Sequence, residues 1–313
     1  MAKRSSTSNL YDPRSGGQSI RVQSLQLDAK LHDLARTNYF AVFLIESGSG
    51  TFWADTSCSS FHADSLLFFV PYQRIRFIPD ASVRAKVIQF HANFLCIETF
   101  HAEAGCSGIL FNDPYGIPRL ELDEPTLSKV KYLLERISSE QDEHDVAYGD
   151  VMLACLKVLL IDAARLKSRS SAGCGTGAFD ARHPTLVELR ELIENHYQTL
   201  HAPADYARRL HLTAKTLGRI VREHLGTTPT ELIRSRILVH AKWQLLHTLK
   251  PVKEISRELG FSDELYFSRI FKKATGYSPT FFRSFETEIR GGSNLSMLSS
   301  NAPILHPAAV ADS

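Results

Sequence analysis

The chain has 313 residues, of which 43% are hydrophobic and 22% charged, and its formal net charge is +2. This composition is ordinary for a folded protein and excludes disorder throughout the chain. Because no apolar run approaches the ~18 residues of a membrane-spanning helix and no secretory signal opens the chain, we expect a two-domain cytoplasmic protein without membrane contact.

The N-terminal half has the pattern of a β-rich domain. Residues 1–19 are rich in Ser and Gly and are predicted to form a disordered arm. From Ile20 to about His91, short apolar runs separated by turn residues predict strands, which are placed at 39–45, 51–54, 66–70 and 75–78. Such strands without intervening helices predict a small barrel or sandwich. Helical periodicity follows at 124–138 and 146–167, and the first domain is predicted to span 20–167.

The C-terminal part is predicted to be all helical. Residues 168–183 have the Ser/Gly composition of a flexible linker, 184–287 are helical in pattern, and 288–313 are predicted to be a disordered tail. Between Pro184 and Phe285 there are 16 Lys and Arg against 10 Asp and Glu, an excess of six positive charges. A basic excess confined to one segment is typical of modules that bind a polyanion.

An internal repeat is the most informative feature of this segment. Residues 206–212 match 255–261 at an offset of 49, and 226–229 match 276–279 at an offset of 50. Each copy reads as a short helix, a tight turn and a second helix, which is the order of a helix-turn-helix.

The second copy illustrates the local signals. Pro251 is predicted to be the first helical residue, Gly260 to form the left-handed turn, and Ser262 to cap the second helix. In the first copy, Thr213 is the predicted cap. Between the copies, Thr228 and Glu231 form a capping box that opens a long helix, so both second helices are expected to enter one face of DNA about a helical turn apart.

These residues resemble the DNA-binding domain of the AraC/XylS family of transcription regulators. The resemblance covers about 184–285 and is most specific over 255–273 and 276–283. It implies base-reading residues and residues placed for phosphate contacts. The base-reading set is Lys215, Thr216, Arg219, Glu264, Leu265, Ser268 and Arg269, and the phosphate set is Arg222, Lys272 and Lys273. Gly218 departs from the family pattern, which usually has a larger side chain there.

The N-terminal half resembles the cupin-like sensing domain of the same family, through the segment 64–71. The fold class is therefore expected to be α+β, with a cupin-like β-barrel and dimerisation helices before an all-α domain of two helix-turn-helix units. The resemblance implies double-stranded DNA and RNA polymerase as partners, a homodimer, an effector of unknown identity, and activation of transcription. No cofactor is expected.

The sequence patterns also fit other classes of protein less well. A plain helical bundle or a scaffold that does not bind DNA would share the helical periodicity but leaves the repeat and its basic faces unexplained. A metal-dependent cupin enzyme needs a His-x-His pair, which the sequence lacks, so we expect no enzyme. A metal- or redox-sensing site is a weaker alternative, and Arg74 with Arg76 could instead bind an acidic effector. The candidate metal ligands are His91, Cys96, His101, Glu103 and Cys106.

Overall fold

The computed structural model of the chain describes residues 9–95, 110–111, 118–173 and 183–290. Nine strands lie in these ranges: β1 (Ile20–Leu27), β2 (His32–Leu34), β3 (Phe40–Ser47), β4 (Ser49–Ala54), β5 (Ser57–His62), β6 (Ser65–Phe69), β7 (Ile75–Pro79), β8 (Val83–Phe90) and β9 (Arg119–Glu121). They form a five-stranded sheet, in the order β1-β8-β3-β6-β9, and a four-stranded sheet, in the order β2-β7-β4-β5. The four predicted strands are thus confirmed as β3, β4, β6 and β7.

The two sheets pack face to face, and the hydrogen bonding of the described strands does not close into the expected barrel. Strand β6 is apolar from Leu66 to Phe69 because both of its faces are covered. Leu67 and Phe69 point into the core between the sheets, whereas Leu66 and Phe68 point into a second core on the other face of the five-stranded sheet. Because alternate side chains of a strand point to opposite faces, a strand with a core on each side carries no polar alternation.

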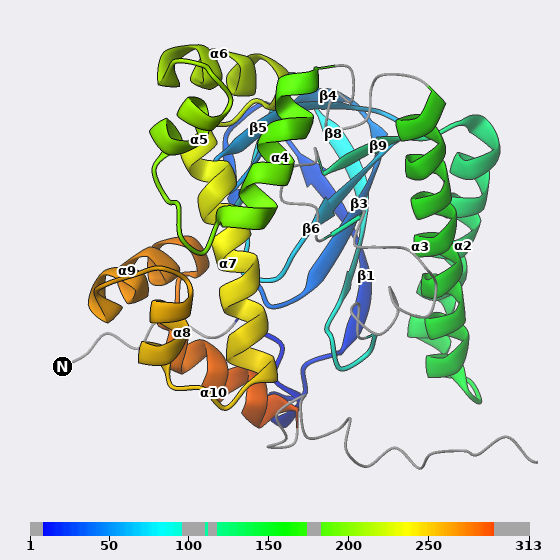
Figure 1. Cartoon of the computed structure of the whole chain (residues 1–313). Coiled ribbons are helices and arrows are strands. Elements are labelled where there is room, and N and C mark those ends of the chain that lie inside the picture. The colour runs from blue at the N-terminus through cyan, green and yellow to red at the C-terminus, as the bar shows by residue number, and fades with distance from the viewer. Residues whose placement is uncertain (1–8, 96–109, 112–117, 174–182, 291–313) are drawn as a thin grey trace, which may run out of the picture.

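Helices α2 (Glu124–Glu143) and α3 (Tyr148–Gly173) complete the second core, on the outer face of the five-stranded sheet (Figure 1). Helix α3 runs six residues past the predicted start of the linker at 168. The reason is that residues 168–172 contain no Gly or Pro that would interrupt the helical backbone. The rest of the predicted linker, up to residue 182, lies outside the described residues.

Seven helices form the C-terminal part of the described chain: α4 (Pro184–His196), α5 (Pro203–Arg209), α6 (Ala214–Leu225), α7 (Pro229–His247), α8 (Val252–Glu258), α9 (Glu264–Thr275) and α10 (Pro279–Ile289). The predicted all-α domain is confirmed. Helix α10 continues two residues beyond the predicted end of this domain at 287, because Ile289 is buried in the core. Helices α6 and α9 lie toward opposite ends of α7 (Figure 1). None of the described helices is long and apolar enough to cross a bilayer.

The prediction that residues 1–19 are disordered is wrong for residues 9–19. Residues 9–19 are ordered, with a 3-10 helix, η1 (Pro13–Ser15), that is capped by Asp12. Leu10 and Tyr11 bury their side chains in the core that also holds the C-terminal helices. Burial of these two apolar side chains favours the ordered arm over a solvated one.

Candidate nucleic-acid interface

The first helix-turn-helix unit consists of α5 and α6. Leu217 and Val221 are buried on the inner face of α6, against the core of the domain. The Thr213 hydroxyl accepts a hydrogen bond from the Thr216 N–H at 3.1 Å, which confirms the predicted cap. Gly226 ends α6 in the left-handed conformation, with φ of 61°. Both ends of this recognition helix are therefore set by local signals.

The second unit, α8 and α9, repeats this arrangement with two differences from the prediction. Pro251 is the N-cap of α8 rather than its first helical residue. The N-cap of α9 is Asp263 instead of Ser262, and its carboxylate accepts from the Leu265 N–H at 2.8 Å. Gly276 closes α9 as Gly226 closes α6, with φ of 89°. A carboxylate at the N-cap also complements the positive end of the helix dipole.

Helix α7 joins the two units. Its predicted capping box is present: the Thr228 hydroxyl accepts from the Glu231 N–H, and the Glu231 carboxylate accepts from the Thr228 N–H. With 19 residues, α7 is about 28 Å long at ~1.5 Å per residue. That length is close to the ~34 Å between successive major grooves on one face of DNA.

The side chains predicted to contact DNA lie on the outer faces of α6 and α9. In α9, Leu265 is 72% exposed and the Arg269 side chain 74% exposed, and in α6 the Arg219 side chain is 65% exposed. Thr216, Glu264 and Ser268 are partly buried. The remaining predicted residues are exposed: Lys215, Arg222, Lys272 and Lys273. Two separate patches result, one on each recognition helix.

Neighbouring side chains hold the two prominent arginines on these faces. Arg219 Nη1 lies 3.3 Å from both carboxylate oxygens of Glu223, one helical turn further on. Arg269 Nη2 lies 3.8 Å from Asp263 Oδ2, and its guanidinium carbon lies 5.9 Å from the centre of the Tyr266 ring. Tyr266 was not singled out from the sequence, although its position three residues before Arg269 is a usable signal. The contact of Asp263 with Arg269 spans six positions, so the one-turn spacing does not indicate it.

Gly218 lies in the middle of α6, and a Cβ added there would meet no atom within 4 Å. We expect Gly218→Ala to raise the free energy of unfolding by about 0.5–1 kcal/mol, because alanine loses less backbone entropy in a helix. Chemical denaturation measures the change. Gly260→Ala is the matched control with the opposite sign: at φ of 80° its Cβ would collide with the Gln198 carbonyl. A destabilised Gly218→Ala protein would contradict the open space around this position.

A buried carboxylate on α10, Glu286, joins the two domains, and no sequence pattern indicated it. Its side chain is almost fully buried, and one oxygen accepts from the Tyr72 hydroxyl and from Asn38 Nδ2. The other oxygen lies 3.4 Å from both His91 Nε2 and Arg290 Nη2. Burial by itself raises the pKa of Glu286, but the hydrogen bond and charge of His91, with Arg290 and Tyr72, outweigh it and lower the pKa overall.

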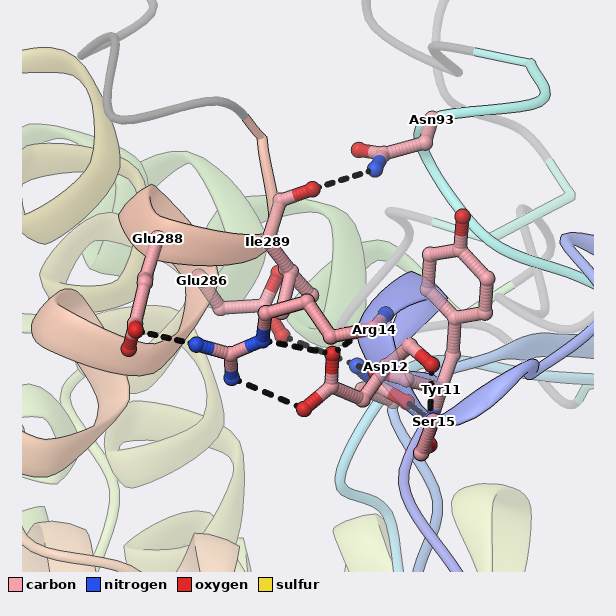
Figure 2. A network of polar contacts seen from close by, with 9 residues as sticks. Tyr11, Asp12, Arg14, Ser15, Asn93, Glu286, Glu288 and Ile289 are labelled. Atoms are coloured by element: carbon pink, nitrogen blue, oxygen red, sulfur yellow. Dashed lines mark hydrogen bonds and ion pairs between the residues drawn. The ribbon is translucent and has the colours of Figure 1, made fainter.

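Further contacts tie the arm and the β domain to α10 (Figure 2). Asn93 Nδ2 donates to the Ile289 carbonyl at 2.9 Å, and Arg14 forms an ion pair with Glu288. Asn38 also exchanges hydrogen bonds with the backbone of Tyr11. Helix α10 therefore carries an interface of the C-terminal helices with the arm and the β domain.

Of the predicted metal ligands, only His91 falls in the described residues. It pairs with Glu286, and its ring lies 4.5 Å from that of Tyr11. These contacts account for the burial of His91 at the interface between the two domains. The others lie outside the described residues, and metal binding by them stays a prediction: Cys96, His101, Glu103 and Cys106.

The two arginines that could bind an acidic effector lie at the start of β7, between β2 and β4. Arg74 forms an ion pair with Asp33. Arg76 lies over the Trp53 ring at 5.3 Å, and its Nε is buried without a hydrogen-bond partner among the described residues. An effector at Arg76 stays a prediction.

Two helix-turn-helix units on one linking helix, beside a two-sheet β domain, define the class of protein by its fold: a double helix-turn-helix domain joined to a β domain. A family model described as a helix-turn-helix domain matches residues 206–284. The matched residues lie within the segment that resembles the AraC/XylS family, and two relatives match over a longer part of the chain.

Those relatives are named as transcriptional activators. The chain is 30% identical over 179 residues to the HTH-type transcriptional activator RhaS of Escherichia fergusonii, a match that covers 56% of this chain and 58% of the relative. It is 28% identical over 202 residues to RhaS of Salmonella arizonae, covering 60% of this chain and 69% of the relative. The chain thus spans a little over half the length of the first of these activators.

Solved structures also match. ToxT from Vibrio cholerae O395 is 15% identical, with 85% of this chain and 98% of ToxT covered and a TM-score of 0.38. The C-terminal domain of AraT, a response regulator from Geobacillus stearothermophilus, is 30% identical, with 32% of this chain and 84% of that domain covered and a TM-score of 0.31.

Proposed function

We propose that this chain is a sequence-specific DNA-binding transcription regulator, an activator acting in the cytoplasm under the control of a small effector. The observation that carries the proposal is the pair of equivalent outer faces on α6 and α9. Arg219 and Arg269, fifty positions apart like the rest of the repeat, are both exposed there. Arginine on a helix that fits the major groove is the commonest reader of guanine.

In this proposal the contacts with double-stranded DNA are divided by position. Base reading falls to the outer faces of the recognition helices, and phosphate binding to the cations nearer their C-terminal ends. The base-reading residues are Lys215, Thr216, Arg219, Glu264, Leu265, Ser268 and Arg269; the phosphate-binding residues are Arg222, Lys272 and Lys273. The basic excess of this domain favours an anionic partner.

The N-terminal β domain is assigned to sensing. Binding of an effector there would shift the population between arrangements of the two domains, so no chemical reaction is part of the proposal and the protein is no enzyme. We assign homodimerisation to α2 and α3, whose outer surface exposes Tyr132 and Val158. Contact with RNA polymerase follows from the names of the relatives as activators.

The proposal is tested by selecting bound sequences from a random duplex library with the full chain. We expect enrichment of two short motifs about one helical turn apart. A single motif would restrict base reading to one recognition helix. Absence of any enrichment would refute sequence-specific binding and favour the scaffold interpretation.

Lys273→Ala tests the division between base and phosphate contacts. Loss of one phosphate contact is expected to weaken binding to all sequences alike and to reduce the slope of log K against log salt by about 0.9. Binding to specific and random duplexes between 50 and 200 mM salt, roughly the range over which such contacts are resolved, gives both values. Lys131→Ala on α2 removes the same charge far from α9 and should leave the slope unchanged. A loss confined to one sequence would instead assign Lys273 to base reading.

A further inference from the structure

The four-stranded sheet touches both helix-turn-helix units, and it does so at its two edges. Strand β5 is one edge, and β2 is the other. From β5, the Cys58 N–H donates to the Gly226 carbonyl at 3.4 Å. Just beyond β2, Arg36 Nη2 donates to the Lys273 carbonyl at 3.3 Å. The same sheet thus reaches the C-terminal end of α6 and the C-terminal end of α9.

The two contacted places are equivalent in the repeat. Gly226 and Gly276 are the left-handed caps that close the recognition helices, fifty residues apart. A Cβ at 226 would overlap the Cys58 carbonyl oxygen, and a Cβ at 276 would lie 3.0 Å from Arg36 Nη1. Both glycines adopt the positive φ of the cap. At 226 glycine also lets the backbone of β5 approach the helix end, whereas at 276 the neighbouring atom is the end of the flexible Arg36 side chain.

A third contact lies between these two. Lys242, in the middle of α7, donates from Nζ to the carbonyl of Pro71, which follows β6. The β domain thus holds the first unit, the linking helix and the second unit at three points. The outer faces of α6 and α9 remain exposed, so these contacts and DNA can be accommodated together.

We propose that the four-stranded sheet is a spacer that sets the separation and relative angle of the two recognition helices, and so selects operators by the spacing of their two motifs. This inference rests on the proposed function. A single helix such as α7 can curve. Contacts at the two edges of one packed sheet, together with the contact between Lys242 and Pro71 after β6, restrain the helix and the two units it joins. Each added base pair moves the second motif about 3.4 Å along the duplex and roughly a tenth of a turn around it.

Two variants remove one edge contact each. Arg36→Ala deletes the side chain that reaches α9. Gly226→Asn keeps the left-handed cap, which asparagine tolerates, but displaces the Cys58 backbone. Matched controls are Arg84→Ala, an exposed arginine of the β domain bonded to Ser47, and Gly16→Asn, a positive-φ cap with nothing within 4 Å.

The readout is the affinity of the full chain for a duplex with the two selected motifs, against duplexes with one base pair inserted or deleted between them. For the wild type and both controls, we expect each spacing change to weaken binding about tenfold or more, since the base contacts of one helix are strained or lost. In Arg36→Ala and Gly226→Asn, the loss should fall to about threefold or less. Affinity for a duplex with one motif should change little.

Circular dichroism checks that each variant is folded, and either folded variant alone decides the question. The spacer proposal would be overturned if both variants lost as much affinity as the wild type when the spacing changes, or if the wild type bound all spacings equally. Either result would leave the proposed DNA binding intact. If the wild type bound neither motif selectively, the proposed function itself would fail.

Discussion

Replacing Glu286 by Ala is expected to lower the free energy of unfolding of the full chain by about 3–5 kcal/mol. The carboxylate is buried between the domains and is held there by Tyr72, Asn38, His91 and Arg290. Removing one member of a buried ionic network leaves its partners without compensation, which costs more than the network contributes in total. Chemical denaturation followed by tryptophan fluorescence and by circular dichroism measures the loss.

Two further variants identify its cause. Glu286→Gln keeps the shape and can still accept from Tyr72 and Asn38, so a smaller loss of about 1–3 kcal/mol is expected from the charged hydrogen bonds alone. Glu288→Gln, two residues along the same helix, removes an exposed carboxylate paired with Arg14 and should change stability little. Equal effects at 286 and 288 would contradict the burial of Glu286.

The lowered pKa of Glu286 adds a dependence on pH with a definite sign. A carboxyl whose pKa is depressed in the folded state stabilises that state above its unfolded pKa, and this contribution is lost as the pH falls through the depressed value. The ordinary value is about 4.5. The stability difference between the wild type and Glu286→Gln should therefore be full at pH 7 and narrow below about pH 4.5. If the stability difference between the two proteins widened on acidification, burial of Glu286 would outweigh its pairing, and its pKa would be raised instead of lowered.

The second large effect is expected at Arg269. If its guanidinium reads a base, Arg269→Ala should weaken binding to the selected duplex by about 1–3 kcal/mol, roughly 5- to 150-fold, and relax the preference at one base position. The structure places Arg269 on the exposed face of α9, with Asp263 and Tyr266 beside it. Competition binding with duplexes that vary each base in turn locates the position.

The comparison with Lys273→Ala separates reading from charge, since both variants lose one positive charge on the same helix. Arg269→Ala should change the base preference, whereas Lys273→Ala should weaken every duplex alike. Arg269→Lys is a further control, because lysine keeps the charge without the planar two-point hydrogen bonding. If Arg269→Ala left the base preference intact, the assignment of the outer face of α9 would be wrong.

Local signals predicted most of the C-terminal domain. The caps at Thr213 and Thr228, the left-handed glycines at 226 and 276, and the apolar spacing of α6 and α9 all involve residues within about four positions of one another. Interactions over so short a range are formed by the backbone of one helix and its neighbours, so the sequence order itself specifies them. The repeat then indicated which helix faces were equivalent.

Local signals were not sufficient to choose the N-cap where two adjacent residues could both cap the helix. Ser262 and Asp263 are both good N-caps, and the structure uses Asp263. Ordering of the arm was likewise missed, because Tyr11 packs against residues as distant as Tyr39 and His91, in the core that also holds the C-terminal helices. The same limit applies to the β domain, whose two sheets are compatible with a cupin-like fold but are not hydrogen-bonded into a closed barrel. Alternation predicts which face a side chain takes but not whether the sheet closes.

What the sequence determined by itself was therefore the class of the C-terminal domain, the place of its recognition helices and the β-rich character of the first half. Only the tertiary structure decided how the two halves meet. Glu286 and Asn38 are 248 positions apart, and Gly226 lies against Cys58 from the other domain. Such pairs follow no period, because their distance in space is set by the packing of whole sheets and helices rather than by the geometry of one element.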